Sequence, residues 1–409
     1  MTFQTTISRL TGALAALPVL GLGALAEPQA RVSGPVVHEN IAVYFVHGPS
    51  APGPVPQTLQ EALAKGTVEV NETGNVQQLT IENKGAEAVF VQFGDIVKGG
   101  QQDRVLTVSL LIEPKSGVIP IGAYCVEQGR WSARGKEDVK RFALSEAIMP
   151  SREAKIAMAK PAAPRPEPRA ILGAAREADQ HRPAGPGATT GTPEQRSADI
   201  ERLRGELRQL QGNERHVAGH GGSDGQSEVW RSVGVVQGML SANLGASVAS
   251  ETSRTSLQLA LEHGRLKEAQ AAYLAALEPK GLEADDIIGV VIAVNGRFSN
   301  ADVYPSNGHF RKMWPKLARS AATEALSVKQ KPAGDKAAGG AAASAAAAPA
   351  VPPAIDAVTA FLAEAETGKP SERQLAGIAR HETRDSDKAL RIEAKSASGA
   401  LVHRNYLAK

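Results

Sequence analysis

Cysteine is nearly absent from this sequence of 409 residues, in which Cys125 is the only one. A single cysteine forms no intramolecular disulfide. A chain that folds without disulfides depends on its hydrophobic core for stability, even where it is exported into an oxidising compartment.

An excess of charge of one sign is also lacking. Lys and Arg together number 46 and Asp and Glu 43, which leaves a formal net charge of +3. The two signs are interspersed, and no stretch forms the dense basic patch that nucleic-acid binding requires. The composition therefore argues against nucleic acid as a partner.

Long apolar runs are missing after the first 26 residues, so we expect no transmembrane segment in the mature chain. Residues 1–26 combine Arg9, an apolar run and the sequence Ala-Leu-Ala at 24–26, in the order of a cleavable signal peptide. Cleavage there predicts a mature chain that begins near Glu27 and is exported, to the periplasm or outside the cell. The alternative is an uncleaved anchor, which Pro18 and three glycines disfavour.

Glycine and proline, in contrast, are abundant, with 40 and 25 residues. Many of the prolines, together with alanine-rich runs, fall in two stretches, 159–196 and 333–353. Segments of this composition bury too little apolar surface to offset the entropy lost on ordering. We therefore predict that both are flexible linkers.

Residues 197–226 lie directly after the first predicted linker. Ile200, Leu203, Leu207 and Leu210 recur at heptad-like spacing, and the rest of the segment is a polar, glycine-rich loop. Two turns of apolar stripe are too few for a coiled coil, so we predict a docking helix followed by a loop.

Residues 31–142 alternate apolar and polar side chains in short runs that are typical of strands. One short helix interrupts them, because Thr58 and Glu61 match a capping box and Gly66 can adopt the left-handed stop. We expect an antiparallel β-rich module, either a sandwich or an open barrel. Its strands are predicted at 36–37, 41–45, 68–70, 79–81, 89–93, 105–112 and 118–126.

The segment 227–328 begins with two helical stretches, 229–244 and 257–277, in which apolar residues recur at helical spacing. A third helix surrounds Trp314. Pro315 lies either in the first turn of this helix or at a kink in it.

The apolar period changes to two before this third helix. Asn295 and Gly296 separate two strand-like runs, and this dipeptide predicts a hairpin because both residues accept positive φ. Residues 354–409 predict a short helix and a closing hairpin. The fold class is therefore α+β: an antiparallel β-rich N-terminal module packed with a helical and hairpin C-terminal part, with Pro- and Ala-rich flexible inserts.

The strongest candidate site is a turn that contains Lys98, Gly99, Gly100 and Arg104. A glycine pair lets the backbone approach an anion closely, and the flanking cations add charge-assisted hydrogen bonds. The turn therefore predicts a phosphate or carboxylate site. The alternative is a hairpin turn with surface charges, since no Walker-type sequence follows it.

Arg130 and Trp131 form a second candidate, a pair that either stacks on a planar ligand or covers an edge of the core. Catalysis has only weak candidates. Cys125 lies in an apolar run and is expected to be a small buried hydrophobe unless folding brings a base to it. Asp302 and His309 flank the end of the predicted hairpin, where such groups transfer protons or are simply solvated.

His216 and His220 are four residues apart, the spacing of two metal ligands on a helix. The residues around them include glycines, which disfavour a helix, so a solvated loop is the better interpretation. We predict neither a metal site nor a cofactor.

Several motifs together resemble a bacterial domain family named for its association with ADP-ribosylglycohydrolases and rhodanese-like phosphatases. The resemblance covers most of the chain outside the signal peptide and linkers. It implies a neighbourhood of ADP-ribose or phosphate chemistry. The motifs are GDIVKGGQQDR, CVEQGRW, SEVW, TSLQ at 255–258, VVIAVNGRFSNADVY followed by FRKMWPKL, and the terminal VHRNYLAK.

The function we favour from the residues is non-catalytic binding of an anionic small molecule or a partner protein near Lys98 and Arg104. The alternative is a hydrolase acting on a phosphate- or ADP-ribose-type substrate. An enzyme requires a nucleophile, a base and anion donors that converge in one concave pocket, whereas a binding module requires only the basic turn and an aromatic face.

Overall fold

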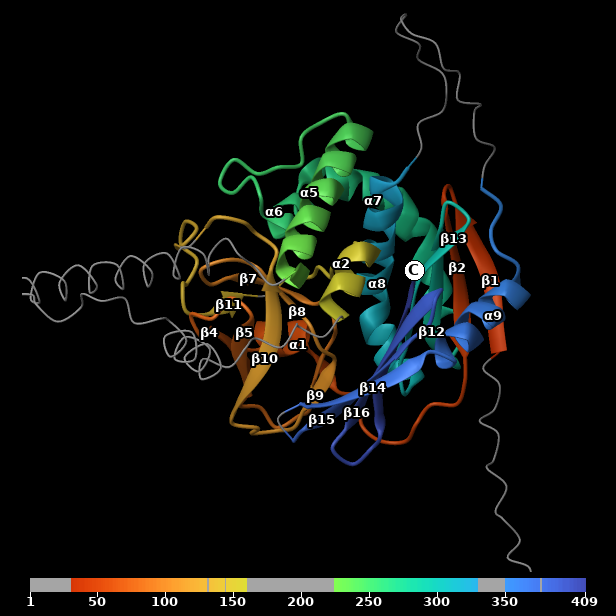
Figure 1. The fold of residues 1–409 in the computed structure, drawn as a ribbon, viewed down its shortest axis with the longest axis horizontal. Coiled ribbons are helices and arrows are strands. Elements are labelled where there is room, and N and C mark those ends of the chain that lie inside the picture. Colours follow the sequence, from red (N-terminus) through yellow and green to blue (C-terminus); the bar gives the residue numbers. More distant parts are fainter. Residues whose placement is uncertain (1–30, 131, 144, 160–223, 330–349, 376) are drawn as a thin grey trace, which may run out of the picture.

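The structure is a computed structural model. The predicted signal peptide, Trp131, residues 160–196 of the first linker and most of the segments 197–226 and 333–353 lie outside the residues that it describes. Figure 1 shows a β-rich region (orange) and a large sheet (red, teal and blue) with helices packed between and above them. The described residues are 31–130, 132–143, 145–159, 224–329, 350–375 and 377–409.

Two small sheets form the β-rich region. One has six strands in the order β11-β7-β8-β10-β5-β4, and the other has three in the order β3-β6-β9. Their apolar side chains, such as those of Leu79, Ile81 and Leu106, form a core of their own. The strands are β3 Gln57–Thr58, β4 Val68–Glu72, β5 Gln78–Asn83, β6 Val89–Val91, β7 Ile96–Gly99, β8 Arg104–Leu106, β9 Leu110–Ile112, β10 Val118–Cys125 and β11 Phe142–Ala143.

The predicted short helix is confirmed as α1, Leu59–Ala64, with both hydrogen bonds of the Thr58 and Glu61 capping box. The predicted single strand 105–112 is wrong, because the chain leaves the six-stranded sheet after Leu106 and enters the three-stranded sheet at Leu110. Most apolar side chains of both short strands are fully buried, so the sequence pattern shows no break.

A third sheet has eight antiparallel strands in the order β1-β2-β12-β13-β17-β16-β15-β14. It combines the N-terminal strands β1 and β2 with strands from the C-terminal part, since β2 pairs with β12 along its whole length. The predicted hairpin at Asn295 and Gly296 is confirmed, with φ of 50° and 72°. The strands are β1 Arg31–His38, β2 Ile41–His47, β12 Ile287–Val294, β13 Arg297–Val303, β14 Lys369–Leu375, β15 Ala379–Asp385, β16 Ala389–Ser396 and β17 Leu401–Ala408.

Helices cover both faces of this sheet. Along β2, Val43 and Phe45 belong to the core shared with most of the helices, whereas Tyr44 and Val46 pack toward α9. This alternation is the period of two that a strand buried on both faces shows. The helices are α2 Arg152–Ala159, α5 Asp224–Leu244, α6 Leu257–Leu261, α7 Gly264–Leu277, the 3₁₀ turn η1 Pro279–Leu282, α8 Asn307–Ser327 and α9 Ile355–Glu366.

The helical predictions hold in outline and differ in detail. The stretch 257–277 is two helices, α6 and α7, because the chain turns at His263, whose ring caps α7. Pro315 lies inside α8 rather than in its first turn, since Ser306 caps the helix well before it. The α+β fold class is confirmed.

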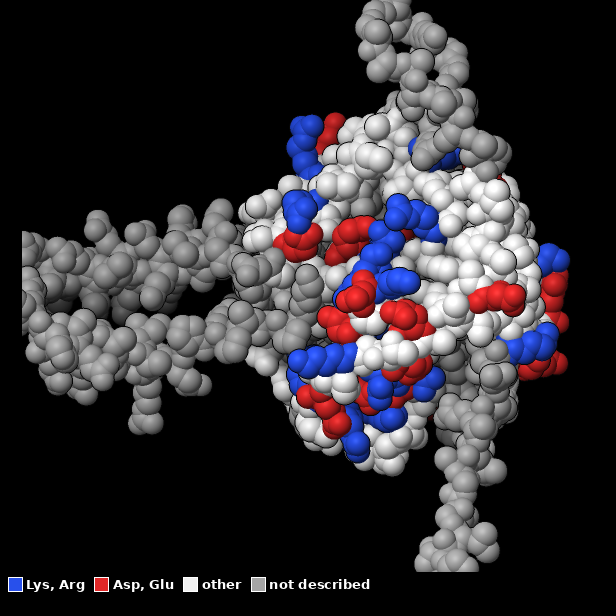
Figure 2. Space-filling view, turned by 45° about the vertical axis from the view of Figure 1, so that its right-hand side comes forward, with Lys and Arg blue, Asp and Glu red and all other residues white. Residues whose placement is uncertain are grey.

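The surface carries charged side chains of both signs beside large uncharged areas. On the face drawn in Figure 2, Lys and Arg lie among Asp and Glu rather than in a patch of their own. None of the helices that the structure describes has the length and apolar character of a membrane span.

Candidate functional site

The predicted anion-binding turn connects β7 to β8, and both glycines have positive φ, 111° at Gly99 and 56° at Gly100. The Gly99 N–H donates to Asp103 Oδ1 (2.9 Å) and the Gly100 N–H to the Asp138 carbonyl (3.1 Å). Arg130 donates to the carbonyl oxygens of Gly100 and Gly99 (3.1 and 3.3 Å). The polar groups of the turn shape the turn itself, and their binding of a ligand stays a prediction.

Asp103, Glu127, Arg130 and Arg134 form a buried arginine–carboxylate cluster beside this turn. Both terminal nitrogens of Arg134 donate to Asp103 (2.9 and 3.0 Å), and Arg130 Nε donates to Glu127 Oε1 (2.8 Å). The hydroxyl of Ser256, which also caps α6, donates to Asp103 Oδ2 (2.7 Å). Both carboxylates are 0% exposed.

The cluster is held together by charge compensation. Burial alone would raise the pKa of Glu127, but hydrogen bonds from the Arg130 side chain and the Asp103 amide lower it below its ordinary value. Loss of one partner from such a buried pair typically costs about 3–5 kcal/mol, because a charge is left uncompensated. The cations of the cluster therefore stay paired with these carboxylates and are not free to bind a ligand.

Arg104 is committed in the same way. Its side chain is fully buried, and it donates to the carbonyl of Gln102 (2.8 Å) and to Glu72 Oε2 (3.2 Å). Lys98, the other cation that the sequence placed at the turn, pairs with a residue outside the β-rich region.

Lys98 reaches α6, where its ammonium donates to both carboxylate oxygens of Glu262 (2.9 and 2.7 Å). Gln258 donates to the same Glu262 (2.8 Å) and accepts a hydrogen bond from Ser145 Oγ (2.6 Å). This chain of hydrogen bonds joins the end of β7, α6 and the loop after β11. Its last three members line one wall of a cavity.

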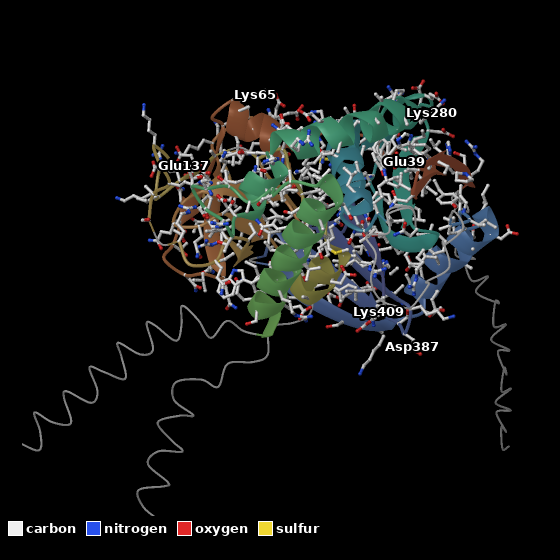
Figure 3. The ribbon with its side chains drawn as sticks, turned by 90° about the horizontal axis from the view of Figure 1, so that it is seen from above. Glu39, Lys65, Glu137, Lys280, Asp387 and Lys409 are labelled. Carbon is white, nitrogen blue, oxygen red and sulfur yellow. The ribbon has the colours of Figure 1, made fainter. Side chains whose placement is uncertain are left out.

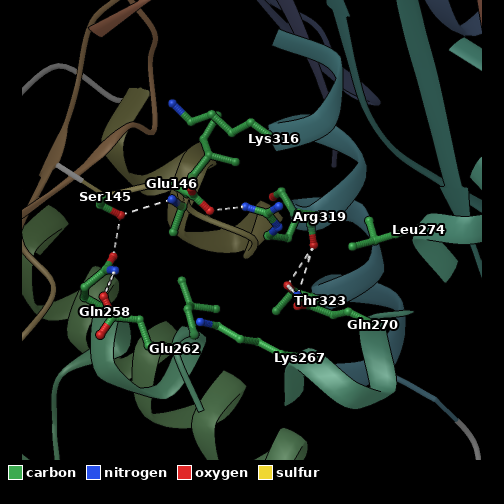
Figure 4. A pocket seen from close by; sticks show the side chains of 14 residues that line it. Ser145, Glu146, Gln258, Glu262, Lys267, Gln270, Leu274, Lys316, Arg319 and Thr323 are labelled. Atoms are coloured by element: carbon green, nitrogen blue, oxygen red, sulfur yellow. Dashed lines mark hydrogen bonds and ion pairs between the residues drawn. The ribbon is translucent and has the colours of Figure 1, made fainter. Parts of the chain in front are cut away.

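The cavity lies between α6, α7, α8 and residues 145–148, and its volume is ≈ 690 Å³ (Figure 4). Volumes of about 300–1,000 Å³ are typical of small-molecule sites. Its lining mixes apolar side chains such as Leu274 with hydroxyls and amides such as Thr323 and Gln270. The charged lining residues are Glu146, Glu262, Lys267, Lys316 and Arg319.

The three cations of the lining differ in how firmly they are paired. Lys316 is buried and forms an ion pair with Asp95. Arg319 pairs with Glu146 (2.7 Å), whose side chain is 73% exposed. The Lys267 side chain makes no hydrogen bond or ion pair within the described part of the chain, and Figure 4 shows it extending across the cavity toward α6.

The comparison with protein families decides where this chain belongs. A model of the ARG and Rhodanese-Phosphatase-superfamily-associated Protein domain, ARPP-1, matches residues 29–182 and 189–407. The chain belongs to this family. Searches of the curated proteins and of the solved structures give no significant match. The resemblance drawn from the sequence motifs is thereby confirmed.

Three of the motifs that suggested ARPP-1 meet in the arginine–carboxylate cluster. GDIVKGGQQDR contributes Asp103, CVEQGRW contributes Glu127 and Arg130, and TSLQ contributes Ser256. TSLQ also contributes Gln258, which lines the cavity. In this ARPP-1 domain α6 therefore connects the cluster to the cavity.

Cys125 lies at the end of β10 and is 0% exposed. Burial raises the pKa of its thiol to about 11, so the reactive thiolate is scarce at neutral pH. Its backbone N–H and C=O both bond the side chain of Gln226 on α5 (2.8 and 2.9 Å). The described residues show Cys125 as part of the ARPP-1 core.

Asp302 lies at the end of β13 in a buried polar junction with His403, Ser109 and Asn405. His403 bonds Asp302 Oδ1 (3.1 Å) and Ser109 Oγ (2.9 Å) through its two ring nitrogens. Although this order resembles a Ser-His-Asp triad, the Ser109 oxygen already accepts the Phe93 N–H (2.8 Å) and all three side chains are buried. The junction joins the three-stranded sheet region to the eight-stranded sheet.

His309, in the first turn of α8, packs edge-on against Phe90 with ring centroids 4.3 Å apart. Burial lowers its pKa to about 3, so the ring is neutral at physiological pH. Neither His309 nor Asp302 lines the cavity. Among the described residues, no group of three His, Cys, Asp or Glu is placed to hold a metal ion.

The sequence missed the residues that line the cavity. Lys267 and Arg319 lie on helices predicted only from their apolar stripes, and nothing in either helix marks a site. The usable signals were two family motifs to which no role was given, TSLQ with Gln258 and FRKMWPKL with Lys316. The position of Trp131, the partner proposed for Arg130, lies outside the described residues.

Proposed function

We propose that this ARPP-1 domain is a non-catalytic binding module that holds an anionic small molecule in the cavity between α6, α7 and α8. The observation that carries the proposal is Lys267, a cation without a hydrogen-bonded partner in the described chain that extends across a cavity of ligand size. An anion that reaches the cavity gains a charge-assisted hydrogen bond there without displacing another group.

Arg319 offers a second contact. Its pair with Glu146 is exposed to solvent, and such pairs contribute about 0–1 kcal/mol. A phosphate or carboxylate group can therefore replace Glu146 at little cost and bind the planar guanidinium through two parallel hydrogen bonds. The arginines of the cluster lack this freedom because their partners are buried.

Lys98 keeps a role in this proposal, although it does not touch the ligand. Its bidentate bond neutralises Glu262, the carboxylate on the cavity wall nearest to Lys267. Without Lys98, the Glu262 charge would compete with the ligand for Lys267. We expect Lys98 to act as a positioning residue.

The hydrolase alternative has less support. Its three candidates are buried outside the cavity: Cys125 as an un-ionised thiol, Asp302 in a fully occupied polar junction, and His309 as a neutral ring. A reaction requires these groups to converge on one accessible point.

Isothermal titration calorimetry of inorganic phosphate, citrate and ADP-ribose tests the proposal. We expect at least one of them to bind the wild type, and Lys267→Ala to weaken that binding about tenfold, or 1.4 kcal/mol, with an unchanged melting temperature. The matched control is Lys280→Ala, because Lys280 lies past the far end of α7 and pairs with Glu283 (Figure 3). Equal weakening by both variants, or no binding to the wild type, would overturn the proposal.

We further propose that the chain is exported. The support is the signal-like sequence of residues 1–26. Mass spectrometry of the protein from its native source should find a chain that starts at Glu27, give or take one residue. An intact N-terminus would contradict export and would favour a membrane anchor or the cytoplasm.

A further inference from the structure

Helix α5 has one face that packs and one that does not. Val229, Val233, Val236 and Leu240 are buried in the core shared with α2 and α8, as the sequence pattern predicts. The opposite face is exposed, and Figure 1 shows α5 at the surface of the molecule. It includes Arg231, Gly234, Val235, Gly238, Met239 and Ala242.

This outward face is unusual for a helix that borders only water. Val235 and Met239 are 59% and 43% exposed, and the charge of Arg231 is paired with Glu228 on the same helix. Solvent-facing positions of an amphipathic helix normally carry charged and polar side chains. Gly234 and Gly238 have open space around them, although glycine destabilises a helix interior relative to alanine. A face of small and apolar residues suits close contact with another helix.

The chain supplies an occupant next to this face. Residues 160–223, which lie outside the described residues, leave from the end of α2 and return at the start of α5, and these two helices pack together. Within them, Ile200, Leu203, Leu207 and Leu210 form the apolar stripe of the predicted docking helix. An amphipathic stripe of this kind requires an apolar surface to pack against.

We propose that residues 197–211 form a helix that docks antiparallel on the outward face of α5. The twelve residues 212–223 connect the two and contain glycines that permit the reversal. Ile200 lies eleven positions before the end of the docking helix at 211, and Val235 lies eleven positions after the start of α5 at Asp224, so the two lie opposite one another. The stripe from Ile200 to Leu210 then covers about 15 Å of α5, at a rise of 1.5 Å per residue.

Disulfide trapping tests the contact. In the full-length double variant Ile200→Cys and Val235→Cys, mild oxidation should form an intramolecular disulfide, because docking gives the two thiols a high effective concentration. The control pairs Ile200→Cys with Val118→Cys, since Val118 is 64% exposed at the end of β10 remote from α5. We expect cross-linking about tenfold faster in the first variant. Native Cys125 is buried and serves as an internal check on folding.

Equal rates in the two variants, or no disulfide in the first, would overturn the proposal. A disulfide between two molecules would overturn it as well, and would assign the face to a second copy of the chain. A second variant, Val235→Asp with Met239→Asp, changes only exposed residues. It should speed trypsin cleavage after Arg202, Arg204 and Arg208 about tenfold, and an unchanged cleavage rate would contradict docking.

Discussion

The arginine–carboxylate cluster and the cavity lie at opposite ends of α6 and use the same kinds of side chain differently. At the start of the helix, Arg134 pairs with Asp103, a carboxylate that is 0% exposed. Beyond its end, Arg319 pairs with Glu146, which is 73% exposed. A buried partner cannot be exchanged for a ligand, whereas an exposed partner can. The burial of the partner, more than the identity of the cation, therefore decides which region binds.

The two regions should differ most in stability when the same substitution is made in both. Arg134→Ala should lower the free energy of unfolding by about 3–5 kcal/mol, because Asp103 and Glu127 lose a buried partner. Arg319→Ala should lower it by no more than about 1 kcal/mol, because its pair is solvated. Urea denaturation of both variants measures the difference. Equal costs would mean that the cluster is not the committed region that its burial suggests.

Acid should act on the core and leave the charges of the cavity cations intact. Burial lowers the pKa of His381, which donates to the Ser109 carbonyl, to about 4. The unfolded chain, with a histidine pKa of about 6.5, binds a proton that the folded chain does not bind. The free energy of unfolding is therefore highest above pH 6.5 and falls toward pH 4 by up to about 3 kcal/mol.

Urea denaturation across this pH window, on the wild type and on His381→Gln, checks the prediction. Glutamine keeps an N–H donor but does not titrate, so the variant should show a flatter pH dependence. Identical slopes for the two proteins would show that His381 is not buried as a neutral ring.

Cys125→Ser should cost about 1–3 kcal/mol of stability, because a more polar hydroxyl replaces a buried thiol whose one hydrogen bond in the described residues is a long contact with the Val76 carbonyl (3.9 Å). Ligand binding per folded molecule should not change, since Cys125 lies outside the cavity. Thermal melts combined with titration calorimetry measure both quantities. Loss of an activity at an unchanged melting temperature would favour the hydrolase alternative instead.

The smallest change in stability is expected when the segment 330–349, which contains most of the predicted linker 333–353, is replaced. Both ends of the segment 330–349 meet the same hairpin: Asn295 donates to the Val328 carbonyl (2.9 Å), and Gly296 lies against Ala350. Replacing the segment by a short Gly-Ser linker should change the free energy of unfolding by less than about 0.5 kcal/mol and leave binding in the cavity unchanged. Urea denaturation measures the first, and a loss of stability like that of Arg134→Ala would make the segment part of the core.

Local patterns in the sequence predicted what local physics determines. The capping box at Thr58, the Asn295 hairpin and the buried stripe of α5 each depend on residues a few positions apart. The family motifs also pointed to residues that meet in space, although not to their role.

The same patterns could not predict which residues pair across long distances in the sequence. The sequence placed Arg104 on an open turn, because the partner that buries it, Glu72, lies 32 positions earlier in another strand. The cavity is assembled from positions between 145 and 323, on three helices and a loop. Nothing in any one of these segments distinguishes a lining residue from a solvated one, so the site appears only once they are packed together.

The most direct test of the account is a crystal structure of the protein soaked with tungstate, an anion whose anomalous scattering marks its position. We expect a peak in the cavity beside Lys267 and Arg319, with the Glu146 side chain turned away. A peak at the amides of Gly99 and Gly100, with none in the cavity, would contradict it.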